Sequence, residues 1–101
     1  MIRIIDGKRY NTKTATLIGE ASHGYLSDFH HWDESLYLSP KGAFFLSGSG
    51  GALSQWSEPA ADGRCGGCGM HVLSVDEALS WAEEHDLDSD AIEKHFRIEE
   101  G

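Results

Sequence analysis

Two cysteines set among glycines are the residues best suited to metal chemistry. Residues 65–69 read Cys-Gly-Gly-Cys-Gly, and His71 follows shortly after. In half of a zinc knuckle, two thiolates at this spacing bind one metal ion while the glycines leave backbone amides free to face the sulfurs. The side chains of Cys65, Cys68, His71 and the upstream His31 would complete a tetrahedral zinc site. An inert loop with two reduced thiols and a reversible disulfide remain as alternatives.

Histidines and aspartates also gather at residues 28–33, a combination that could support acid–base catalysis. However, no serine or cysteine has a sequence context that indicates a catalytic triad. Residues 48–51 (Gly-Ser-Gly-Gly) lack the Gly-Lys-Ser/Thr end of a phosphate-binding loop. A thioredoxin-type motif requires a strand–helix junction, whereas residues 65–68 precede an expected strand. We therefore expect no enzymatic activity and assign no catalytic residue.

The charge of the chain is concentrated near its C-terminus. Residues 76–101 hold ten acidic side chains against Lys94 and Arg97, which gives −8 of the net charge of −9. Such a surface repels nucleic acid and membranes and attracts basic partners. The sequence thus favours a protein partner, with no direct binding of nucleic acid or membrane.

Helix capping explains part of this charge. Asp76, Glu77, Asp88 and Asp90 fall near expected helix N-termini, where the macrodipole favours carboxylates. Plain solubilisation and a partner-binding surface both remain open for the others. If a partner binds, the expected contact residues surround the turn between the two helices: Glu83, Glu84, Asp86, Asp88, Asp90 and Glu93.

Turn signals divide the first 75 residues into strands. Asp6-Gly7 between residues 2–5 and 8–10 predicts a tight hairpin. A second hairpin is expected where residues 40–42 (Pro-Lys-Gly) join strands at 35–39 and 43–47. Further extended segments are expected at residues 15–20 and 70–73. Residues 21–33 and 57–69 are expected to be irregular, and the glycines at 48–51 to form a bulge or tight bend.

Two helices are expected to follow the strands. Ser74 and Glu77 form a capping box, and Val75, Ala78, Leu79 and Ala82 would face inward from a helix that ends near His85. Asp88 would cap a second helix through about Phe96, with Ile92 and Phe96 inward. The fold class is therefore α+β in a single domain, residues 1–101, with an antiparallel sheet of about four or five strands and two C-terminal helices packed on one side.

Membrane and export signals are not expected. There is no apolar run near 18 residues, and residues 1–10 lack the apolar segment and cleavage site of a signal peptide. We expect the protein to lie in the cytoplasm of a bacterial cell.

Three stretches carry a resemblance to a family. They read GKRYNTKTA at residues 7–15, KGAFFLSGSGG at 41–51 and LSVDEALSWAE at 73–83. The chain resembles small acidic proteins carried by bacteriophages, prophages and other mobile elements, in which these motifs recur in this order. The resemblance implies a protein that acts on host machinery. Small acidic phage proteins of this size include anti-CRISPR proteins, which bind Cas effectors and block engagement of DNA or guide RNA.

Two functions are compatible with these sequence features. The first is a non-enzymatic inhibitor, an anti-CRISPR protein whose acidic helices bind a basic groove of a Cas protein or CRISPR effector complex. The alternative is a small zinc-stabilised module that contacts proteins through the loop of Cys65 and Cys68. An open edge strand invites pairing, so both a monomer and a homodimer remain open.

Overall fold

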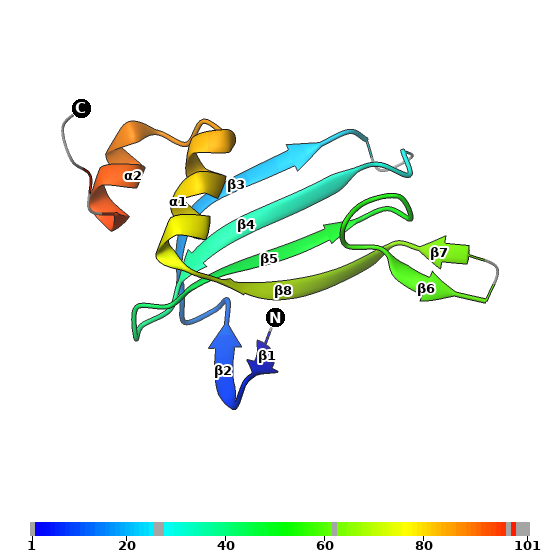
Figure 1. The fold of residues 1–101 in the computed structure, drawn as a ribbon, viewed down its shortest axis with the longest axis horizontal. Helices are drawn as coiled ribbons and strands as arrows, with labels where there is room; N and C mark the ends of the chain where they lie inside the picture. The colour runs from blue at the N-terminus through cyan, green and yellow to red at the C-terminus, as the bar shows by residue number, and fades with distance from the viewer. Residues whose placement is uncertain (1, 26–27, 62, 97, 99–101) are drawn as a thin grey trace.

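A four-stranded antiparallel sheet forms the centre of the structure, a computed structural model that describes residues 2–25, 28–61, 63–96 and 98. The strand order is β3-β4-β5-β8, so three neighbouring strands follow one another along the chain and the fourth returns to the edge (Figure 1). The strands are β3 (Thr16–His23), β4 (Trp32–Leu38), β5 (Phe44–Gly50) and β8 (Gly67–Leu73).

Two small hairpins accompany this sheet. The first joins β1 (Ile2–Ile5) to β2 (Lys8–Asn11), and its turn residues Asp6 and Gly7 both have positive φ, 51° and 76°. The hairpin predicted from Asp-Gly is confirmed, since a tight turn of this kind requires positive φ at both positions. The second joins β6 (Glu58–Ala60) to β7 (Gly63–Cys65).

Two C-terminal helices cover one face of the sheet at one end (Figure 1). These are α1 (Val75–Glu84) and α2 (Ser89–His95). The Ser74 hydroxyl accepts a hydrogen bond from the Glu77 N–H, and the Glu77 carboxylate accepts one from the Ser74 N–H. Asp88 caps α2 by accepting from the Asp90 N–H. The predicted caps and the α+β class are confirmed.

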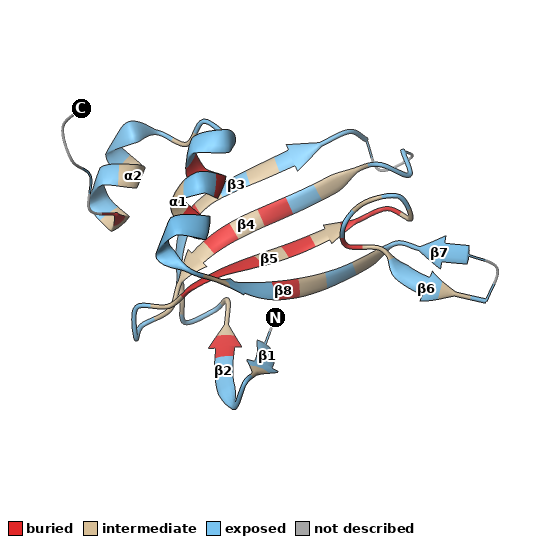
Figure 2. Ribbon diagram, viewed as in Figure 1, coloured by how far each residue is buried: buried red, intermediate tan, exposed pale blue. Residues whose placement is uncertain are grey.

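The sheet is packed on both faces, and Figure 2 marks its buried positions along the strands. Leu36 and Leu46 face the helices, as the period-two pattern predicts. Phe45 points to the other face and packs with Tyr10 and Met70. A central strand with apolar contacts on both faces explains the consecutive apolar residues at 43–46.

The side chains of α1 that face the sheet differ from the prediction at one residue. Val75 is 58% exposed, whereas Ala78, Trp81 and Ala82 are buried. The prediction for Val75 was wrong because the large Trp81 ring selects the face that turns towards the sheet. The two alanines beside it allow the helix backbone to approach the strands closely.

The strands are longer than predicted. β3 extends to His23 and β4 begins at Trp32, within the segment expected to be irregular. Residues 48–50 continue β5 and pair with residues 67–69 of β8, so the expected bulge at the glycines was wrong. The register shift lies instead in β3, between Leu17 and Gly19.

A tryptophan explains one glycine of β5 and the glycine opposite it on β8. A Cβ atom on Gly48 would overlap the indole of Trp56, and one on Gly69, its partner across the strands, would lie 3.3 Å from Trp56 Cζ3. The two glycines therefore leave a shallow recess into which the buried Trp56 ring packs. The sequence pattern shows the glycines but not the ring that requires them.

A side chain that fills this recess should destabilise the fold. We expect Gly48→Ala to lower the free energy of unfolding by about 1–3 kcal/mol, because the methyl group displaces a packed ring. Gly69→Ala is the matched control on the neighbouring strand and should have a smaller effect. Urea unfolding measures both, and equal losses for the two variants would contradict this account of Trp56.

The capping box should make stability depend on pH. The hydrogen bond from the Ser74 backbone N–H, helped by the Ser74 hydroxyl, lowers the pKa of Glu77 below its ordinary value. The stabilisation from these hydrogen bonds is therefore complete at pH values above the ordinary pKa of a glutamate. It is lost as the pH falls through the lower pKa of Glu77 in the folded chain.

We therefore expect Glu77→Gln to reduce stability at neutral pH and to make little difference in acid. Unfolding by urea at neutral pH and near pH 2 measures this, with the exposed Glu58→Gln as the control. A Glu77→Gln loss of the same size at both pH values would contradict the expected linkage.

Candidate functional site

One carboxylate is buried against the helices. Glu34, on β4, is only 4% exposed. Its Oε1 accepts a hydrogen bond from Trp81 Nε1–H of α1 at 2.9 Å. Its Oε2 accepts one from Trp56 Nε1–H at 2.8 Å and another from the Gln55 side-chain amide. Glu34 thereby joins the sheet to α1 and to the loop after β5.

In the described hydrogen bonds of Glu34, its carboxylate is the acceptor each time. Three N–H groups from Gln55, Trp56 and Trp81 converge on its two oxygens, and an ionised carboxylate is a pure acceptor. Bonds to a charged acceptor are stronger than neutral ones. The described donors are neutral, so within the described part of the chain dipoles rather than an opposite charge surround this carboxylate.

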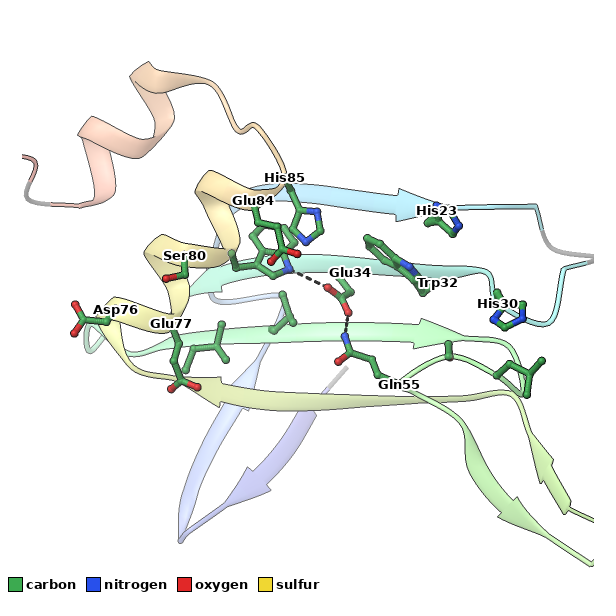
Figure 3. Close-up of a pocket in the computed structure, with 15 residues that line it drawn as sticks. His23, His30, Trp32, Glu34, Gln55, Asp76, Glu77, Ser80, Glu84 and His85 are labelled. Carbon is green, nitrogen blue, oxygen red and sulfur yellow. Dashed lines mark hydrogen bonds between the residues drawn. The ribbon is translucent and has the colours of Figure 1, made fainter.

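Glu34 lies in an open groove of about 860 Å³ between α1 and the sheet (Figure 3). We call it the Glu34 groove and define it by Trp32, Glu34, Gln55, Asp76, Glu77, Ser80, Glu84 and His85, with His23 and His30 towards the other end. The described residues that line it include no lysine or arginine. Four carboxylates therefore give the groove a negative potential.

Contacts between aromatic rings fix the side of this groove that Trp32 and His85 form. Trp32 stacks on His23 with ring centroids 6.1 Å apart and meets His85 edge-on at 5.4 Å. His85 also contacts Trp81 at 4.7 Å. His85 is the C-cap of α1, so the end of that helix is held between two tryptophan rings.

The predicted partner-binding residues lie together around the two helices. We call them the acidic helical face, and all six are exposed: Glu83, Glu84, Asp86, Asp88, Asp90 and Glu93. Glu83 and Glu84 end α1, and Asp86 turns the chain with φ 53°. Glu99 and Glu100 lie outside the described residues. Glu84 belongs both to this face and to the Glu34 groove.

The predicted zinc ligands are distributed over β7, β8 and the residue before β4. Cys65 ends β7, and Cys68 lies on β8 opposite Ser49. His71 stacks on Trp56 at 4.8 Å, on the other face of β8 from Cys68 because strand side chains alternate. His31 Nδ1 contacts the Asp28 carbonyl. Among the described residues no group of three or more histidine, cysteine or acidic side chains could hold a metal ion, and the zinc site stays a sequence-based prediction.

Sequence reasoning did not single out Glu34. Its signal is the period-two run Trp32, Glu34, Leu36 and Leu38, in which a glutamate takes a position that faces the apolar core. Such a carboxylate requires buried donors. The donors lie 21 to 47 residues away in the chain, so local pattern could not identify them.

These features define a small α+β protein with an acidic helical face and a negatively charged groove. Comparisons with protein-family models, curated proteins and solved structures found no match. Within the part of the chain that is described, neither helix has the length and apolar character needed to cross a membrane.

Removing the charge of Glu34 should weaken the fold. We expect Glu34→Gln to lower the free energy of unfolding by about 2–3 kcal/mol, because its amide turns hydrogens towards an indole N–H and leaves a buried donor unpaired. Glu20→Gln, at an exposed position on the adjacent strand, should change stability by less than about 0.5 kcal/mol. Urea unfolding at neutral pH provides the measurement. Equal stability of Glu34→Gln and wild type would contradict the assigned role.

Proposed function

We propose that this protein is a non-enzymatic inhibitor that binds a basic, nucleic-acid-binding groove of a partner protein through its acidic helical face. The observation that carries the proposal is the charge around α1 and α2. The described residues from 76 onward hold eight acidic side chains, one lysine (Lys94) and no arginine. An array of carboxylates can take the place of phosphates in a groove lined by arginine and lysine.

The resemblance to small acidic proteins of mobile elements suggests the particular partner. We propose a Cas protein or CRISPR effector complex, which would make the protein an anti-CRISPR protein of the bacterial cytoplasm. Guide RNA and target DNA are bound in positively charged channels of such effectors. A carboxylate-bearing surface would compete there without itself binding nucleic acid.

The helices that carry these charges are anchored to the sheet, which supports a preformed surface. Trp81 ties α1 to Glu34, and the ring of Phe96 at the end of α2 stacks on Phe44 at 4.8 Å and 6°. A surface that is ordered before binding loses less conformational entropy on association.

An apolar tip lies at the end of the sheet away from the helices and would provide a further contact with the partner protein. Tyr25, Phe29 and Leu53 are exposed, and the Leu53 N–H donates to the Phe29 carbonyl at 2.8 Å. Leu53 and His30 also line the far end of the Glu34 groove. Aromatic side chains are favoured at the centres of protein interfaces, so the tip would add contact area to the charged face.

Charge reversal on this face should abolish inhibition. We expect Glu83→Lys with Glu93→Lys to weaken binding to the Cas effector by about tenfold or more, because opposed charges across an interface become like charges. Lysine near a helix C-terminus is favoured by the macrodipole, so the variant should fold normally. Pull-down and DNA-cleavage assays measure the effect.

The matched control reverses two exposed charges away from the helices, Glu20→Lys with Glu58→Lys. It gives the same net charge and should retain inhibition. Binding of the wild type should also weaken with added salt, because exposed charges are screened. Full inhibition by the Glu83 and Glu93 double variant would refute the role of the acidic helical face.

A further inference from the structure

We propose that the Glu34 groove is a binding site for an arginine side chain of the protein partner. The inference rests on the proposed function and adds to it a specific pocket and a specific chemical group. Glu34 and Gln55 lie at the middle of the groove, with Trp32 and His85 beside them (Figure 3). The guanidinium group would enter between Trp32 and the carboxylates of α1.

The negative charge of the Glu34 groove is the first reason to assign an arginine to it. Asp76, Glu77 and Glu84 line the groove together with the buried Glu34, and the described lining has no basic side chain except histidine. An ionised carboxylate that is removed from water is stabilised most by a nearby cation. Among the described residues, the hydrogen-bond donors to Glu34 are three neutral N–H groups. A bound cation would add a positive charge beside this carboxylate.

Hydrogen-bonding capacity is the second reason. From the described residues, Glu34 Oε1 accepts one hydrogen bond, from Trp81, although a carboxylate oxygen has room for two. The Glu84 carboxylate is exposed at the rim of the same groove. A guanidinium carries five N–H donors in a rigid fork, which suits carboxylates that approach from different directions.

The aromatic wall favours arginine over other cations. Trp32 is half-buried and lines the groove, and a guanidinium stacks on a tryptophan face. A lysine ammonium is more strongly hydrated and has no planar surface. Among the described residues no three ligands converge for a metal ion. A groove of about 860 Å³ also lies within the range of about 300–1,000 Å³ typical of ligand sites.

Tryptophan fluorescence of the full chain can test the proposal. The chain has three tryptophans, of which Trp32 lines the groove and Trp56 and Trp81 bind Glu34. The probes are capped Gly-Gly-Xaa-Gly-Gly peptides in which the central residue is arginine, citrulline or lysine. Citrulline has nearly the shape of arginine but no charge. The arginine peptide should give a saturable change, with affinity at least tenfold above citrulline and severalfold above lysine.

Two groove variants and one control locate the site. Trp32→Leu and Glu84→Gln should each weaken the arginine peptide severalfold or more. Glu93→Gln removes a charge from the acidic helical face outside the groove and should leave its affinity within about twofold. Far-UV circular dichroism and urea unfolding identify any variant that loses its fold. Only folded variants are compared, and both groove variants change residues that do not hydrogen-bond Glu34.

Several outcomes would overturn the proposal. These are no saturable binding of the arginine peptide, equal binding of the citrulline peptide, lysine binding as tight as arginine, or full affinity in both groove variants. Tighter binding of spermidine than of the arginine peptide would assign the groove to a small polyamine instead. The peptide assay contains no Cas effector, so it tests the groove and not the acidic helical face. If the arginine peptide does not bind but the Glu83 and Glu93 double variant still loses inhibition, the groove proposal is refuted and the proposed function is supported.

Discussion

The buried carboxylate of Glu34 is the interaction on which the rest of the structure depends. Through the indoles of Trp56 and Trp81 it holds the loop after β5 and the helix α1 against the same face of the sheet. Gly48 and Gly69 allow the Trp56 ring to reach that position. A charge in the core is unfavourable unless every donor is in place, so the network enforces one arrangement of these segments.

That arrangement determines where the acidic residues lie. Trp81 and Glu84 are three positions apart on α1, so anchoring the tryptophan to Glu34 leaves the glutamate at the rim of the groove. Glu83 and Glu84 stand at the C-terminal end of α1, where the helix macrodipole disfavours negative charge. Their placement reduces helix stability slightly, which is consistent with a surface kept for contact with a partner.

The features that the sequence predicted are local ones. The Asp6-Gly7 turn and the Ser74–Glu77 capping box depend on residues within a few positions of each other, and both are present. The continuation of β5 through its glycines was missed because the groups that crowd them, Trp56 at Gly48 and Ser54 at Gly50, lie outside the strand. Glu34 was missed for the same reason, since Trp81 lies 47 residues away. Long-range partners that meet only in the folded chain leave no spacing pattern.

The packing of β5 on both faces gives the molecule a gradient of local stability. Phe44, Phe45 and Leu46 are buried near the end of the sheet that carries the helices and the β1–β2 hairpin, whereas the β6–β7 hairpin at the opposite end is mostly exposed. Backbone hydrogen bonds around residues 44–46 should therefore break only in global unfolding, while those of β6 and β7 open by local fluctuations. Amides of the two ends would exchange with solvent on very different timescales.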